Sequence, residues 1–225
     1  MSASVSNFVS QLIDVGSMLK WTKQDYKTMP WKNGGGSTTE LAIFPQGARL
    51  DDFVWRLSTA QVNMPGPFSH FAQIDRSLAI LSGEGLILHN HDGDKLRAST
   101  RLHQDSLPHR FAGETPIHAE LCGGPVVDLN LMTRRDVCQH FMQKLSSGEH
   151  VVEAADAQQV LLYCAAGDAT LEPDFRLQAG DLIMLDEEHE HAGIKCRIRA
   201  EEGAILYLMR ISFLNQGEGK YAAMG

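Results

Sequence analysis

The chain has 225 residues, of which 43% are hydrophobic, and a formal net charge of −8 at pH 7. This composition is ordinary for a folded protein and excludes a disordered chain, and the length suffices for one large domain or two small ones. Apart from Arg134 and Arg135, lysines and arginines are scattered singly, so the sequence lacks the basic patch of a nucleic-acid-binding protein.

Residues 1–20 lack the basic segment and the long apolar core of a secretion signal. No later run approaches the roughly 18 apolar residues that a membrane-spanning helix needs. We therefore expect a cytoplasmic protein with no membrane contact, and we interpret residues 1–20 as an N-terminal extension. The four cysteines contain no C-x-x-C pair, which argues against a zinc knuckle and favours small buried thiols: Cys122, Cys138, Cys164 and Cys196.

The stretch PWKNGGGSTTEL, residues 30–41, places three glycines before an extended run. Neither the spacing of a phosphate-binding P-loop nor that of a dinucleotide-binding loop is present, so phosphate binding is not indicated. The stretch is either a mobile connection or a sharp bend close to a ligand. Thr38 and Glu40 share one face of the strand that follows, and Trp31 and Asn33 are unusual residues for a tether.

Strand-like runs rich in branched and aromatic residues recur between turn signals, at residues 52–62, 78–88, 117–121, 126–132, 159–171, 180–186 and 203–211. Asp92-Gly93 predicts a hairpin turn. The best helical candidate is the end of the segment 133–148. The pattern predicts an all-β sandwich or barrel.

The chain contains a weak internal repeat of strand, glycine turn and strand. LAILSGEGLIL (78–88) and VLLYCAAGDATL (160–171) follow this plan, and each copy closes with an apolar strand, PVVDLNLM or GAILYLMRI. The repeat predicts two β-barrel lobes in tandem. We place the first lobe at residues 21–145 and the second at residues 146–225.

Alternation puts selected polar residues on one face of two strands. Arg56 and Ser58 share one face of the run 54–60, and Asp128 and Asn130 share one face of the run 126–134. These faces are either solvated or turned into a barrel lumen. In a lumen, Arg56 would need an acid such as Asp128 or Glu40, or an anionic ligand, because an unpaired buried charge is costly.

Two His-x-His pairs have a spacing that permits metal chelation, since residues two apart on a strand share a face. His89 and His91 adjoin the predicted hairpin turn, and His189 and His191 lie in the polar segment DEEHEH. Neither pair has the accompanying glutamate of a metal site, so we predict no metal and no cofactor. No G-x-S-x-G motif or assembled triad indicates nucleophilic catalysis.

PWKNGGGSTTEL, WRLSTA, GPFSHF with IDRSLAILSGEG, and VVDLNLMTRRDVC appear in the order of the signature blocks of the HutD/Ves family, which the chain resembles over residues 21–140. The resemblance implies a bicupin, two cupin-like β-barrel lobes in one chain, linked to bacterial histidine utilisation. It implies ligand-binding residues in the first lobe, which also favours the lumen interpretation: Trp31, Asn33, Thr38, Glu40, Arg56, Ser58, Phe68, Ser69, Phe71, Arg76, Asp128, Asn130 and Arg134.

These residues suit a small carboxylate, because an arginine binds a carboxylate through two hydrogen bonds and aromatic walls exclude water. The resemblance suggests urocanate or N-formylglutamate as the ligand of a non-catalytic sensor that tunes histidine utilisation. The alternative is a metal-dependent cupin enzyme acting on a small carboxylic acid. A third hypothesis is an interaction protein, and exposed sheet edges are compatible with a homodimer.

Overall fold

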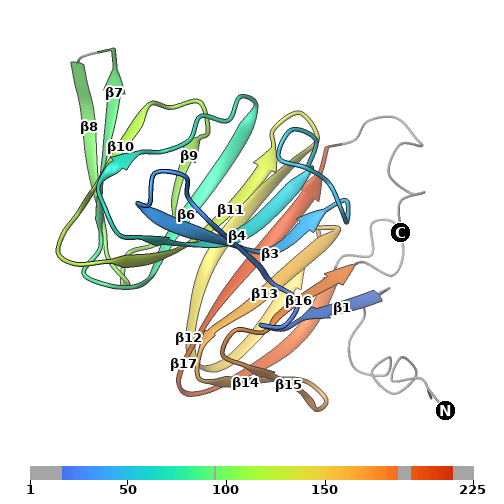
Figure 1. Cartoon of the computed structure of the whole chain (residues 1–225). Coiled ribbons are helices and arrows are strands. Elements are labelled where there is room, and N and C mark those ends of the chain that lie inside the picture. The colour runs from blue at the N-terminus through green and yellow to red at the C-terminus, as the bar shows by residue number, and fades with distance from the viewer. Residues whose placement is uncertain (1–16, 94, 187–193, 215–225) are drawn as a thin grey trace. The chain divides into compact units, whose positions relative to one another are not determined.

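The computed structural model describes residues 17–93, 95–186 and 194–214, and every regular element within these ranges is a β-strand (Figure 1). The predicted all-β class is therefore confirmed. The described residues hold no helix that is long and apolar enough to cross a membrane. The chain divides into two compact units, which we call the first lobe (residues 25–139 with Leu214) and the second lobe (residues 17–24 and 140–213).

The first lobe contains two antiparallel sheets. One has the order β2-β3-β4-β11-β6-β9, with β2 Lys27–Pro30, β3 Gly36–Phe44, β4 Trp55–Val62, β11 Val126–Arg134, β6 Ile74–Ser82 and β9 His109–Ala112. The other has the order β5-β10-β7-β8, with β5 Gly66–Pro67, β10 Ile117–Leu121, β7 Leu86–Asp92 and β8 Lys95–Leu102.

An apolar core fills part of the space between these two sheets. Leu78 and Ile80 of β6 pack in one cluster with Leu88 of β7 and Ala119 of β10. These residues alternate with more exposed neighbours along β7 and β10, as expected of strands with one buried face. The polar residues of the candidate site lie on the same inner face of the larger sheet.

The second lobe is one sheet with the order β1-β16-β13-β17-β14-β15, and β12 also pairs with β17. Its strands are β1 Ser17–Trp21, β16 Leu182–Asp186, β13 Gln159–Ala166, β17 Ile194–Phe213, β14 Asp168–Leu171, β15 Phe175–Gln178 and β12 Cys138–Ala154. Its core is formed by aliphatic residues of all the longer strands, among them Leu162, Leu206 and Ile183.

Several expectations are confirmed at the level of single strands. The run 78–88 forms β6 and β7 around a turn with glycines, and the run 159–171 forms β13 and β14 around another. The turn at Asp92-Gly93 joins the paired strands β7 and β8. All four cysteines are free, and all except Cys122 are buried.

One expectation is wrong. The helix candidate within 133–148 is part of β12, in which Cys138, His140 and Met142 are buried while the residues between them are exposed. Burial with a period of two belongs to a strand, and pairing with β17 stabilises it. Residues 17–20, the end of the segment interpreted as an N-terminal extension, belong to β1 (Ser17–Trp21), which pairs with β16. Along the sequence, the division between the two compact units falls between Gln139 and His140, and the first lobe was expected to extend to residue 145.

Candidate functional site

A cavity of about 600 Å³ lies in the first lobe, on the inner face of the larger sheet. Eleven residues that the sequence nominated line it: Trp31, Asn33, Thr38, Arg56, Ser58, Phe68, Ser69, Phe71, Arg76, Asp128 and Asn130. The tertiary structure thus brings together residues that span about a hundred positions of the sequence.

Strand register explains why the two arginines meet. Arg56 of β4 and Arg76 of β6 both pair with Met132 of β11, so the three side chains form one row across the sheet. Side chains in such a row point to the same face. Only 5% of Arg56 and 4% of Arg76 are exposed, so two guanidinium groups are buried in one cavity. The lumen interpretation of the polar strand faces fits this arrangement, and the solvated interpretation does not.

Arg56 is held by an acid beside the cavity. Its Nε donates a 2.8 Å hydrogen bond to Oε2 of Glu40, and its Nη1 lies 3.4 Å from Oγ of Ser58. Glu40 does not line the cavity itself. The register of β3 shifts between Glu40 and Ala42, which leaves Glu40 paired with Ser58 on the face of Arg56. The predicted acidic partner of Arg56 is therefore Glu40.

Arg76 is surrounded by aromatic rings. Its guanidinium carbon lies 4.9 Å from the ring centre of Phe68, 5.8 Å from that of Phe71 and 5.0 Å from that of Phe111. Nη1 donates to the backbone oxygen of Ser69, whereas Nε is buried without a hydrogen-bond partner among the described residues. Burial lowers the pKa of Arg76 to about 10, so the side chain keeps its charge near neutral pH.

Asp128 is the buried carboxyl group of the cavity. Burial raises its pKa to about 7, and the charge of Arg76 and a hydrogen bond from the backbone of Ala60 offset only part of that effect. Its Oδ2 and the Oδ1 of the neighbouring Asn130 are both buried, and neither has a hydrogen-bond partner within the described part of the chain. The cavity therefore contains one hydrogen-bond donor, Arg76 Nε, and two acceptors, Asp128 Oδ2 and Asn130 Oδ1, that have no partner among the described residues.

The glycine stretch forms the tight connection between β2 and β3. The backbone nitrogen of Trp31 donates to the oxygen of Gly36, and the nitrogen of Gly35 donates to Oδ1 of Asn33. Gly34 has a φ of 72°, which favours glycine, and a side chain at Gly36 would overlap the carbonyl oxygen of Gln61. The glycines thus let the chain turn sharply beside the cavity, with the Trp31 indole bonded to Thr38.

Arg134, which the family resemblance also nominated, is not among the residues that line the cavity. Its Nε donates to the backbone oxygen of Phe53, and its Nη2 donates to that of Asp51, each at 3.0 Å. Arg134 is the last residue of β11, so its side chain reaches the loop before β4 and stabilises that loop.

Sequence reasoning missed several cavity residues: Met29, Lys32, Leu50, Met64 and Met132 line it, and Phe111 completes the aromatic ring set around Arg76. Met132 could have been found, because it shares a strand face with Asp128 and Asn130. Lys32 stands between two nominated residues. Leu50 and Met64 lie in loops, where no periodic pattern indicates direction.

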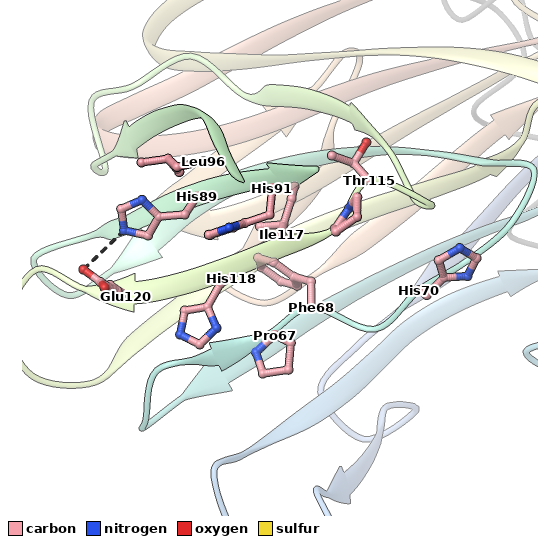
Figure 2. A pocket seen from close by; sticks show the side chains of 11 residues that line it. Pro67, Phe68, His70, His89, His91, Leu96, Thr115, Ile117, His118 and Glu120 are labelled. Atoms are coloured by element: carbon pink, nitrogen blue, oxygen red, sulfur yellow. Dashed lines mark ion pairs between the residues drawn. The ribbon is translucent and has the colours of Figure 1, made fainter. Parts of the chain in front are cut away.

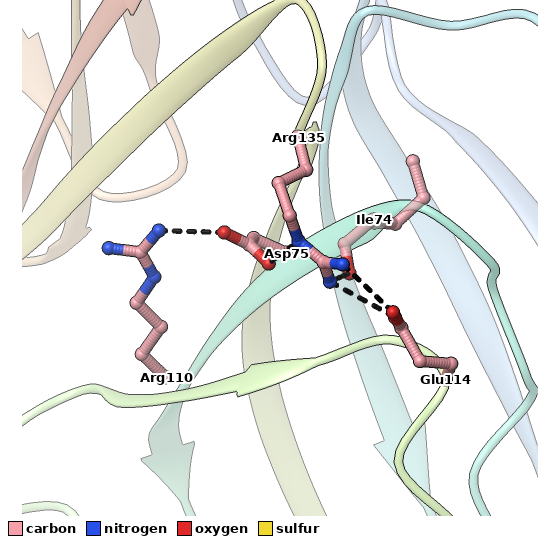
Figure 3. Close-up of polar contacts among 5 residues, drawn as sticks. All are labelled: Ile74, Asp75, Arg110, Glu114 and Arg135. Carbon is pink, nitrogen blue, oxygen red and sulfur yellow. Dashed lines mark hydrogen bonds and ion pairs between the residues drawn. The ribbon is translucent and has the colours of Figure 1, made fainter.

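A cluster of charged residues fixes the strand that carries Arg76 (Figure 3). Arg135 donates from Nε to Oδ1 of Asp75 at 2.7 Å and from both terminal nitrogens to Glu114. Arg110 donates to the other oxygen of Asp75. Although burial acts to raise it, these hydrogen bonds hold the pKa of Asp75 below its usual value. The start of β6 is thereby tied to β9 and to the residues that follow β11.

A second, more open groove of about 710 Å³ lies on the outer face of the smaller sheet, and Figure 2 shows four histidines along it: His70, His89, His91 and His118. His89 lies with Nε2 3.3 Å from Oε2 of Glu120 and with Nδ1 2.8 Å from Oγ of Ser99. Within the described residues, no three His, Cys, Asp or Glu side chains are arranged to hold a metal ion. His189 and His191 lie outside the described residues.

In a comparison with protein families, the model of the HutD family matches residues 23–206 of this chain. An uncharacterised 21.2 kDa protein in the hutC 3′ region of Pseudomonas putida is 38% identical over 180 residues, which cover 78% of this chain and 90% of the relative. Protein Ves of Cronobacter sakazakii is 40% identical over 119 residues, or 51% of this chain; the match spans only 61% of the length of that relative.

Solved structures agree with this grouping. A conserved protein of unknown function from Pseudomonas aeruginosa PAO1 superposes with a TM-score of 0.75 at 31% identity, over 87% of this chain and 99% of the other. HutD from Pseudomonas fluorescens SBW25 superposes with a TM-score of 0.72 at 28% identity, over 88% of this chain and 100% of the other. An oxalate decarboxylase variant of Bacillus subtilis superposes with a TM-score of 0.60 at 9% identity, over 88% of this chain and 77% of the other. At this identity the likeness shows the fold alone, and it confirms the expected cupin fold.

Proposed function

The chain belongs to the HutD family, and from that premise we propose that the cavity of its first lobe binds a small carboxylate metabolite and that the protein is a non-catalytic sensor. One observation carries the proposal: two buried guanidinium groups face the same cavity, and one of them has an unsatisfied N–H group. An anion with two oxygens is the simplest group that satisfies such a pair.

The charge balance of the cavity favours an anion. The Arg56 guanidinium forms an ion pair with Glu40, whereas Arg76 interacts with the carboxyl group of Asp128 only through its charge. The pKa of Asp128 is about 7, so this carboxyl group is partly protonated near neutral pH. A buried cation without a full counter-charge is costly. A bound carboxylate would remove that cost, and part of its affinity would come from doing so.

Size and wall chemistry favour a small organic acid over an inorganic ion. A volume of about 600 Å³ falls within the range of about 300–1,000 Å³ that is typical of small-molecule sites. Phe68, Phe71 and the methionines Met29, Met64 and Met132 line the same cavity, and they offer apolar contact to a carbon skeleton. A ligand with a carboxylate and a short apolar or conjugated body uses both kinds of wall.

Histidine utilisation is the metabolic setting that the relatives suggest, since one of them is encoded in the hutC 3′ region and another is HutD. Urocanate and N-formylglutamate, intermediates of histidine breakdown, are carboxylates of suitable size. In this proposal the bound acid reports the flux of the pathway, and the protein tunes the pathway without transforming the acid.

Isothermal titration calorimetry with urocanate and with N-formylglutamate tests the proposal. We expect one acid to bind and the Arg76→Ala variant to lose most of the affinity. Arg110→Ala is the matched control, because Arg110 is an exposed arginine of the same lobe that does not line the cavity. Absence of heat and of competition for every acid of the pathway, with a protein that unfolds cooperatively, would contradict the proposal.

A further inference from the structure

Binding of a carboxylate alone leaves two buried oxygens of the cavity unsatisfied. Asp128 Oδ2 and Asn130 Oδ1 have no hydrogen-bond partner among the described residues, and only 1% of Asp128 and 8% of Asn130 are exposed. Both residues line the cavity, and they stand two positions apart on β11, so their side chains share its inner face. They form a pair of acceptors, which we call the acceptor pair.

The neighbouring arginines do not satisfy the acceptor pair. Glu40 and Ser58 accept from Nε and Nη1 of Arg56, and the backbone of Ser69 accepts from Nη1 of Arg76. When Asp128 is ionised, an incoming carboxylate cannot satisfy the pair either, because an ionised carboxylate only accepts hydrogen bonds and would repel the Asp128 carboxylate. Leaving a buried acceptor unpaired costs about 1–3 kcal/mol, so a donor is expected to come from the ligand.

Strand register leaves room for such a donor. Asp128 pairs with Ala60, and Asn130 pairs with Ser58, so each acceptor stands opposite a small side chain of β4. The row that contains Arg56, Met132 and Arg76 lies next to the Asn130 row along β11. The cavity therefore presents cationic donors in one row, Asn130 in the next row and Asp128 in the row after that.

We propose, on the basis of the carboxylate site described above, that the ligand is a carboxylic acid that also carries an N–H group, with the carboxylate at Arg56 and Arg76 and the N–H at the acceptor pair. The N–H of an amide or an imidazole can be shared between two adjacent acceptors, and an ammonium group offers an N–H to each. Either suits the acceptor pair better than a hydroxyl, because a hydroxyl oxygen brings lone pairs of its own. The acceptor pair is then what separates this ligand from simple fatty or dicarboxylic acids.

Matched pairs of acids test this inference by calorimetry at a pH of about 8, where Asp128 is mostly ionised. One pair is N-formylglutamate and its N-methyl derivative, which lacks the N–H. The other is urocanate and 3-(2-furyl)acrylate, in which a furan replaces the imidazole. In the pair that binds, we expect loss of the N–H to weaken binding at least about tenfold, as when a buried acceptor is left unpaired.

Variants locate the effect. Asp128→Asn, which keeps the shape of the side chain, and Asn130→Leu should both reduce the preference for the N–H acid, whereas Arg134→Ala, outside the cavity, should keep it. Equal affinity within each pair, with binding that still requires Arg76, overturns this inference and leaves the carboxylate site intact. A preference that persists unchanged in both acceptor variants also overturns it. Binding of no acid at all by the folded protein removes both proposals.

Discussion

The Nε of Arg56 donates a 2.8 Å hydrogen bond to Oε2 of Glu40, although the two residues belong to different strands and lie 16 positions apart in the sequence. Glu40 reaches Arg56 because β3 changes register after it, and it does so from beside the cavity rather than from within it. The pair fixes the direction of the guanidinium before any ligand arrives, which reduces the entropy that binding would cost.

Replacement of Arg56 tests how much of the binding depends on the guanidinium fork. We expect Arg56→Ala to lose roughly 2–4 kcal/mol of binding free energy, as when one partner of a buried charged contact is removed. Arg56→Lys keeps the charge but not the two parallel donors, so it should recover only part of that loss. Titration of the preferred acid measures both, and an alanine variant that binds like the wild type would place the carboxylate elsewhere.

The pH dependence of stability tests the burial of Asp128. Its pKa is about 7 in the folded protein against a usual value of 3.8, so between these values the folded state holds more protons than the unfolded state. The free energy of unfolding contributed by this group is therefore fully present below about pH 4 and is lost as the pH rises to about 7.

Asp128→Asn removes this dependence while it keeps the shape of the side chain. Relative to the wild type, the variant should gain stability as the pH rises from about 5 to about 8, by an amount on the order of 2 kcal/mol, since each pKa unit corresponds to about 1.4 kcal/mol. Urea unfolding of both proteins at the two pH values measures the difference. A constant difference would mean that Asp128 ionises normally.

Gly36 tests the close approach at the turn between β2 and β3. A Cβ at this position would overlap the carbonyl oxygen of Gln61, a backbone atom that cannot move aside easily. We expect Gly36→Ala to lower the free energy of unfolding by more than about 2 kcal/mol. Gly66→Ala is the control, because nothing lies within 4 Å of its added Cβ. Similar stabilities of the two variants in thermal unfolding would refute the steric argument.

Arg134 should affect stability and not ligand binding. Its two hydrogen bonds go to the backbone oxygens of Phe53 and Asp51, so Arg134→Ala leaves those oxygens without these donors. We expect a loss of about 1–3 kcal/mol in the free energy of unfolding, with an unchanged affinity for the preferred acid. A variant of normal stability that fails to bind would restore Arg134 to the site.

The charged cluster at the start of β6 should depend on Arg135 more than on Arg110. Arg135 donates to Asp75, to both oxygens of Glu114 and to the backbone of Ile74, whereas Arg110 makes a single contact with Asp75. We expect Arg135→Ala to cost about 1–2 kcal/mol and Arg110→Ala less than about 1 kcal/mol. Denaturant unfolding at low and high salt compares them, and equal losses would show that the network adds nothing beyond single ion pairs.

The sequence by itself determined most of the strands and the relative faces of the polar residues. Runs of branched residues between glycine turns predicted most of the strands, and alternation placed Arg56 with Ser58 and Asp128 with Asn130. These features are local, because a strand has a period of two wherever it lies. The resemblance to the family also rests on local features, since four short blocks in a fixed order carry it.

Tertiary structure alone decided which polar face is enclosed and which residues reach it. Alternation separates the two faces of a strand but does not say which one a second sheet will cover. The aim of Arg134 away from the cavity, the contribution of Phe111 to the surroundings of Arg76 and the strand rather than helix at Cys138–Ala154 all depend on partners far along the chain. These contacts are set by pairing between strands that are distant in the sequence, and the periodicity of a single segment does not predict which strands will pair.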